Sequence, residues 1–310
     1  MRTLQTGLGI ARHETEATFL VNGLIAIRIS KIMLERVKEL IVQPGAPNLY
    51  WALTKLPEPF VDFRSGFDFE MRLLELTFPE LADLDKQRTP GQWRALVAKI
   101  EKTLPLLGAG KEAMLVCPTI LSELIDKTYP DAKRHLIKRQ GRPASQVKAM
   151  ARQQVVLIHL LDNYAQLRDE FFKWYELPCW QSRSALDKAE RRLDQVTRNE
   201  TNPFASLVLP PFGNVFPRQA GAERSIAALR VIEALRMYAV AHDRALPERL
   251  NQIRLVPVPK DPMTGRAFEY RRDGEAALLT ARAPKGLSAE EFGLRYRISI
   301  RPKAAGPDSK

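Results

Sequence analysis

The chain has 310 residues, of which 45% are hydrophobic, and 48 Lys and Arg against 36 Asp and Glu give a net charge of +12. This composition excludes an intrinsically disordered protein, and the length suits one large globular domain or two ordinary ones. The two cysteines, Cys117 and Cys179, exclude a disulfide-framework protein and a structural zinc site, which needs four ligands. The basic excess permits attraction to nucleic acid or to anionic lipid.

The longest strongly apolar run near the start covers residues 17–27. It is too short to cross a bilayer, which takes about 20 residues. A charged region before it and a small-residue cleavage site after it, which would mark a signal peptide, are both missing. The chain by itself is therefore predicted to be soluble and cytoplasmic, with no transmembrane segment.

Helical periodicity dominates the chain up to about residue 200. Apolar residues recur at steps of three and four almost from Met1 to Ile41, and the Pro- and Gly-rich segment 43–48 ends that pattern. Thr89, Pro90 and Gln92 form a typical helix start with a capping box. Further helices are expected over residues 48–56, 57–78, 89–107, 111–130, 131–141, 143–177 and 182–199. Because the connections between these helices are short, we expect neighbouring helices to pair as antiparallel hairpins.

The pattern changes after a Pro-rich break at residues 202–221. An amphipathic helix over 223–243 is followed by a short helix at 246–253 and a turn at 261–265. Alternating apolar residues then predict strands over 267–272, 275–282 and 293–300. Asp273 and Gly274 are the strongest signal for a tight hairpin between the first two strands.

The expected fold is mainly α with a small C-terminal α+β module, in which helical hairpins precede a long helix packed on a three-stranded antiparallel sheet. We expect a helical domain over residues 1–215, cut short at its N-terminus. The α+β module is expected over residues 216–310, with a disordered tail after about residue 302.

The segment from Glu223 to Ala281 resembles the soluble part of a type II secretion pseudopilin. The resemblance is carried by the helix "RVIEALRMYAVAHD", the "LPERL" segment and "DPMTGRAFEY" with its hairpin. It implies a fold, but the helix carries charges where a pilin has a long apolar segment, so filament assembly is not implied. Pseudopilin sheets can hold calcium near the position of Asp261. Four basic residues crowd this turn, so we expect Asp261 to form the turn instead.

Nearly the whole chain is similar to a family of uncharacterised, helix-rich proteins common in planctomycete bacteria. The matching stretches include "QPGAPNLYWALTKLPEPFVD" and "DEFFKWYELP". In such relatives a helical region, often behind a membrane anchor or signal segment, precedes the equivalent of Met1. An upstream segment of that kind would place the protein in the cell envelope and make Cys117 and Cys179 disulfide candidates. The family brings no established activity.

Complete catalytic, cofactor-binding or metal-binding motifs are missing from the sequence. Gly7 and Gly9 lack the preceding strand of a dinucleotide loop, and the segment 108–113 lacks the spacing of a phosphate loop. The four histidines show no ligand spacing, and His159 with Asp162 is expected to form a structural pair on one helix. The acidic residues Asp68, Glu70 and Glu75 are expected to be solvated.

Two segments could form binding surfaces. The basic block 131–152 is either a solvated helix face or a nucleic-acid patch; the patch residues would be Lys133, Arg134, Lys138, Arg139 and Arg142. The aromatic stretch 171–180 contains Trp174, Tyr175 and Trp180, which would stack on bases, bind a protein partner or wedge into the core.

The sequence therefore predicts a non-catalytic structural or protein-interaction protein, with the cell envelope as one location. Nucleic-acid binding through the basic block is the first alternative. An enzyme without a recognisable motif is the second.

Overall fold

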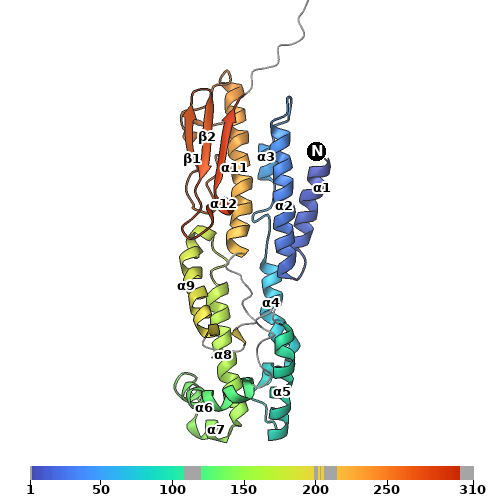
Figure 1. Cartoon of the computed structure of the whole chain (residues 1–310), viewed down its shortest axis with the longest axis vertical. Helices are drawn as coiled ribbons and strands as arrows, with labels where there is room; N and C mark the ends of the chain where they lie inside the picture. Colours follow the sequence, from blue (N-terminus) through green and yellow to red (C-terminus); the bar gives the residue numbers. More distant parts are fainter. Residues whose placement is uncertain (1, 108–119, 199–201, 203, 206–214, 301–310) are drawn as a thin grey trace, which may run out of the picture. The chain divides into compact units, whose positions relative to one another are not determined.

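The computed structural model describes residues 2–107, 120–198, 202, 204–205 and 215–300. The chain is mainly helical, with a three-stranded antiparallel sheet near its C-terminal end, as predicted (Figure 1). Its contacts divide it into two compact units. Unit 1 comprises residues 1–66, 178–181 and 214–310, and unit 2 comprises residues 67–177 and 182–213. The tail after residue 302, the segment 108–113 and Cys117 lie outside the described residues.

This grouping differs from the division at residues 215 and 216 that the sequence indicates. The first 66 residues group with the C-terminal module, whereas most of the helices that follow them in sequence belong to unit 2. Helical periodicity identifies a buried face but not the element that covers it, so it groups neighbours along the chain. The domain boundary itself stays a prediction.

Unit 1 is built around the long helix α11, Val215–Ala241. In Figure 1 this helix lies between the sheet and a helical layer that contains α2, Leu20–Ile41, and α3, Tyr50–Thr54. Helix α1, Arg2–Thr15, packs along α2. Most of α11 is buried around its whole circumference, which is the pattern of a helix in the centre of a fold.

The first two helices form a hairpin where the sequence indicates one helical run to Ile41. The helical pattern breaks between Thr15 and Leu20. A Cβ atom on Gly7 would lie 2.1 Å from the Sδ atom of Met33, so this glycine lets α1 approach α2 closely. Gly23 on α2 leaves room for Phe63, which lies in a non-helical segment, because a Cβ atom on Gly23 would lie 2.2 Å from the Phe63 ring.

The sheet contains β1, Glu269–Asp273, β2, Ala276–Ala281, and β3, Leu294–Ser299, in the order β1-β2-β3. Gly274 has a φ of 61°, as the predicted tight turn requires. The short elements of this module are η4, Leu250–Gln252, and α12, Ala289–Phe292. Ala277 and Leu279 of β2 are almost fully buried, and Figure 1 shows α11 alongside the sheet.

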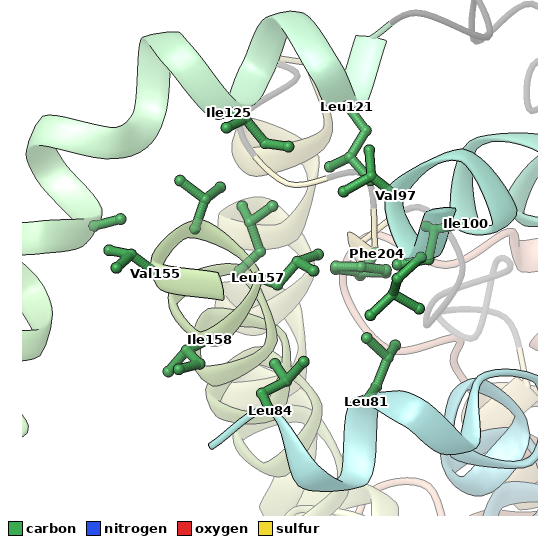
Figure 2. Close-up of a cluster of buried hydrophobic side chains, with 14 of the residues drawn as sticks. Leu81, Leu84, Val97, Ile100, Leu121, Ile125, Val155, Leu157, Ile158 and Phe204 are labelled. Atoms are coloured by element: carbon green, nitrogen blue, oxygen red, sulfur yellow. The ribbon is translucent and has the colours of Figure 1, made fainter. Parts of the chain in front are cut away.

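Unit 2 is helical throughout its described residues. The elements are α4, Arg64–Thr77, which begins in unit 1; η1, Pro79–Asp83; α5, Pro90–Leu107; α6, Ile120–Lys138; α7, Ala144–Ala149; α8, Arg152–Phe172; and α9, Cys179–Arg198, whose first residues belong to unit 1. The predicted capping box at the start of α5 is present: Thr89 N donates to Gln92 Oε1 over 2.8 Å, and Gln92 N donates to Thr89 Oγ1 over 3.3 Å. Apolar side chains of unit 2 meet in one core, which includes Ile100, Leu157 and Phe204 (Figure 2).

Several helix boundaries differ from the sequence-based expectation. Helix α4 begins at Arg64 and not at residue 57, and α9 begins at Cys179 and not at residue 182. Helix α6 runs through Pro130 without the expected break between residues 130 and 131. The expected single helix over 143–177 is instead interrupted at Met150 and Ala151, both of which have extended backbone angles. Neither of the last two outcomes follows from local propensity, since burial of the flanking helices decides where a proline or a break is tolerated.

Candidate functional site

The predicted basic patch lies at the C-terminal end of α6 and in the turn after it. Arg134 forms an ion pair with Asp131, and Arg142 forms one with Asp85. Residues 133 and 138 are five positions apart on the helix, which places them about 140° apart around its axis. The structure therefore brings the five predicted residues to one end of α6 but not onto one face, and two of their charges are already paired. Nucleic-acid binding here stays a prediction.

The three predicted aromatic residues belong to two different packing units. Tyr175 of unit 2 packs edge-on against Phe67, with ring centroids 4.6 Å apart. Trp174 of unit 2 is partly buried beneath the Lys173 ammonium group, 5.1 Å from the ring centroid. Trp180 belongs to unit 1, where a Cβ atom on Gly265 would lie 2.7 Å from the indole ring. Each aromatic residue is thus engaged within its own unit.

Asp261 forms the turn as predicted, and it does so as half of a buried ion pair. Arg224 of α11 donates to Oδ1 from Nε over 2.8 Å and to Oδ2 from Nη2 over 2.6 Å. The backbone N–H of Met263 and the hydroxyl of Thr264 also donate to this carboxylate. Arg224 reaches on to the carbonyl oxygen of Phe292 over 2.6 Å. The pair thereby fastens the turn and the end of α12 to α11.

A cluster of two histidines and a carboxylate links α6 to α8. His135 Nε2 lies 2.6 Å from Asp162 Oδ2, so Asp162 pairs with His135 and not with His159 as predicted. The ring of His159 lies 4.7 Å from that of His135, and its Nε2 lies 3.1 Å from Asn163 Nδ2. Burial, helped by the neighbouring His135, lowers the pKa of His159.

Chemically, this cluster is an imidazole oriented by a carboxylate, which is half of a nucleophilic catalytic arrangement. The contacts found for His135 and His159 among the described residues include no hydroxyl or thiol that they could activate. Within the same residues, no group of three His, Cys, Asp or Glu side chains is arranged to hold a metal ion. The contacts that are present support a structural link between two helices.

Helix α2 carries an exposed apolar face that the sequence reasoning missed. Its buried side includes Ile27 and Leu34, which pack within unit 1. On the other side, Val21, Ile25 and Ile32 are 58%, 44% and 44% exposed. At 100° per residue these three positions fall within about 40° of one another. We call them the outer α2 face. The exposed Arg28 lies on the same side, between Ile25 and Ile32, so the apolar stripe contains one charged residue. The signal was present in the sequence, because "LVNGLIAIRIS" is apolar on both sides of the helix.

Large exposed side chains that stand alone are normal on a protein surface, but aligned ones are not. A helix that is apolar on both sides is typically covered on both sides. The outer α2 face is therefore the feature of unit 1 that most directly indicates a missing contact.

Within the described ranges, no helix combines the length and the apolarity needed to cross a lipid bilayer. Comparison of the chain with protein-family models, curated proteins and solved structures finds no match. The function must accordingly be argued from the geometry of this chain alone.

Proposed function

We propose that this protein is a non-catalytic interaction protein whose outer α2 face binds a helix of a partner protein. The observation that carries this proposal is the alignment of Val21, Ile25 and Ile32 on the exposed side of α2. Full burial of a Val or Ile side chain contributes about 1.5–3 kcal/mol. These three side chains are about half exposed, so a partner that covers them gains roughly 1 kcal/mol from each.

The dimensions of the outer α2 face fit a helix. From residue 21 to residue 32 the helix rises about 16 Å, which is three turns. A partner helix of similar length would cover this stripe with ridges that pack into its grooves. Glu35, Arg36 and Glu39 continue the same side of α2, and Arg36 pairs with Glu39 over 2.7 Å. They supply the polar rim that surrounds the apolar centre of a typical interface.

Location in the cell envelope is part of the same proposal and rests on the family resemblance alone. The outer α2 face would serve equally in either compartment. Photocrosslinking from this face therefore tests the binding surface and not the location.

Site-specific photocrosslinking in the source cells tests the proposal. A photoreactive phenylalanine analogue is placed at position 25 or 32, and in a control chain at position 12, which is exposed on α1. We expect positions 25 and 32 to give the same discrete adduct with another protein, and position 12 not to give it. A Val21→Asp substitution in the same chain should remove the adduct from position 32.

Two results would contradict the proposal. One is the absence of any adduct from positions 25 and 32 when the protein is present at its normal level. The other is an adduct that forms from position 12 as well and survives Val21→Asp, since contact would then be independent of the apolar face. Circular dichroism of the Val21→Asp chain checks that unit 1 is still folded, which its exposed position leads us to expect.

A further inference from the structure

The solvent-facing side of the sheet in unit 1 carries an ordered set of arginines. The strand register places Arg271 of β1, Leu278 of β2 and Arg297 of β3 in one row across the sheet. The neighbouring row ends in Arg295 of β3. Because side chains alternate along a strand, these four residues share one face. We call it the arginine face, and it is independent of the outer α2 face.

The opposite side of the sheet is the buried one. Leu279, which alternates with Leu278, is fully buried, and its row contains Tyr270 and Tyr296. The three arginines are exposed, and Leu278 is half-buried between them. The apolar side chain thus lies at the centre of the face, with a guanidinium group on each side.

The same side of β1 also carries Glu269 and Asp273, so the charges on the arginine face are only partly balanced within the chain. Among the ion pairs of the described residues, none includes Arg271, Arg295 or Arg297, whereas nearby Arg282 pairs with Glu269 over 3.5 Å. Glu269 also accepts a hydrogen bond from Thr280 over 3.1 Å. Asp273 lies one row further along β1. Three like charges on a small surface repel one another, and an anionic partner would relieve that repulsion.

The composition of the face favours a protein partner over a nucleic acid. The outward positions of the three strands hold no aromatic side chain on which a base could stack. A phosphate backbone offers no apolar surface, so contact with it would not stabilise burial of Leu278 at the centre. An apolar centre flanked by arginines is the usual composition of a protein interface, where guanidinium groups bind carboxylates through paired hydrogen bonds.

The distance between Arg271 and Arg297 further restricts the kind of protein segment that would fit this face. Neighbouring strands lie about 4.8 Å apart, so the Cα atoms of Arg271 and Arg297 are separated by about 10 Å across β2. Two residues seven positions apart on a helix are also separated by about 10 Å and face the same way. The residue three or four positions along the helix lies midway between them.

We infer that the arginine face binds an acidic amphipathic helix of a partner protein, laid across the strands. Two carboxylates of that helix, seven residues apart, would pair with Arg271 and Arg297. An apolar residue midway between them would contact Leu278, and Arg295 would lie beside the helix as an additional cation. The match of spacing, charge and apolar centre carries this inference.

Fluorescence anisotropy with a defined probe tests it. The probe is a labelled, helix-stabilised peptide with the pattern Glu-x-x-Leu-x-x-x-Glu, and the control peptide has Gln at both Glu positions. Titrations are made with the full chain at low ionic strength. We expect saturable binding of the acidic peptide, weakened about tenfold or more by the double change Arg271→Gln and Arg297→Gln. Leu278→Thr should weaken it about threefold or more.

Arg282→Gln is the matched control, because Arg282 is exposed on the same module but already paired. It should change the affinity by less than about twofold. Loss of binding with Arg282→Gln equal to that of the double variant would overturn the inference, since only net charge would then matter. Absence of saturable binding would also overturn it.

A third arm uses an oligothymidylate probe under the same conditions. Tighter binding of this probe, independent of Leu278, would overturn the inference in favour of a phosphate-binding face. The photocrosslinking result at the outer α2 face can fail or succeed without affecting any of these outcomes, because the two surfaces share no residue. Thermal unfolding of each variant checks that the sheet is intact.

Discussion

The two units bury polar groups in different ways. In unit 2 the buried side chains of Gln154 and Asn202 are neutral, and each donates to a backbone carbonyl oxygen over 2.8 Å. Among the described residues, the buried charged side chains all belong to unit 1: Arg224, Glu233 and Asp261. Unit 1 thus combines an apolar core with ionic contacts, and unit 2 combines its core with amide contacts.

Both kinds of contact join segments that are distant in the chain: 37 and 184 residues for the charged groups of unit 1, and 42 and 70 residues for the amides of unit 2. Glu233 of α11 accepts a hydrogen bond from the backbone N–H of Leu49, 184 residues away, over 2.9 Å. Asn48 donates in turn to the carbonyl oxygen of Glu233. Apolar contacts have no direction, so they leave the register of two distant segments loosely defined, whereas hydrogen bonds to charges fix it. Directional hydrogen bonds thus fix distant segments in both units, and unit 1 differs in using charged groups, whose hydrogen bonds are the stronger ones.

Removing the acid of the buried pair should have the largest effect. Asp261→Ala leaves the Arg224 guanidinium buried without its partner, and such changes typically cost about 3–5 kcal/mol. We expect hydrogen exchange followed by mass spectrometry to show lost protection in peptides from 215–300. Peptides from 152–172 in unit 2 should keep theirs. An equal loss of protection in both units would mean that they do not open separately. It would contradict the idea that the buried ion pair stabilises unit 1 alone.

The exposed Asp273→Ala variant is the control for that experiment. It removes a carboxylate from the same C-terminal module without uncovering a buried charge. Its effect should stay within about 0.5 kcal/mol.

Glu223 is a half-buried carboxylate that has no guanidinium partner in the contacts of the described residues. Burial raises its pKa from 4.5 to about 7, although its Oε1 accepts a hydrogen bond from Phe60 N. The folded state therefore holds the proton more tightly than the unfolded state does. Stability from this group is present below pH 4.5 and is lost as the pH rises through about 7.

Glu223→Gln keeps the hydrogen-bond acceptor and removes the charge. At pH 8 the variant should be more stable than the wild type by up to about 3 kcal/mol, and at pH 5 the difference should be small. Urea unfolding of both chains at the two pH values measures it. A variant that is equally or less stable at pH 8 would show that the ionised carboxylate is well accommodated.

Overpacking against Gly23 of α2 should give the smallest of these effects. Gly23→Ala forces the buried ring of Phe63 to move, because the new Cβ would lie 2.2 Å from it. Overpacking of this kind costs about 1–3 kcal/mol. Gly9→Ala is the matched control, since a Cβ atom added there would meet no atom of another element within 4 Å. It should stabilise the helix by up to about 1 kcal/mol. Similar effects of both substitutions on the urea midpoint would contradict the packing argument.

Local features of the fold were predictable from the sequence. The strands of the C-terminal sheet, the turn at Gly274 and the capping box at Thr89 depend on residues that are close in the chain. The interruption at Met150 and the uninterrupted helix through Pro130 depend on tertiary packing and were not predictable. The same holds for the pairing of the first 66 residues with the C-terminal module.

Most of the candidate site also depends on tertiary contacts and could not be predicted from the sequence. The partner of Asp261 is Arg224, 37 residues earlier, and only the fold brings the two together. The arginine face needs the register of three strands, which no single stretch contains. The outer α2 face could have been found by comparing both sides of one helix, since all its residues lie between Leu20 and Ile41.

The distance between Asn48 and its acceptor at Glu233, 185 residues, has a consequence for synthesis on the ribosome. At about 5–20 residues per second, the first two helices emerge on the order of ten to forty seconds before the helix that covers them. During that time the outer α2 face and the side of α2 that later packs on α11 are open to water. The nascent N-terminal hairpin is therefore a natural client for a chaperone that shields apolar helices until the last third of the chain has been made.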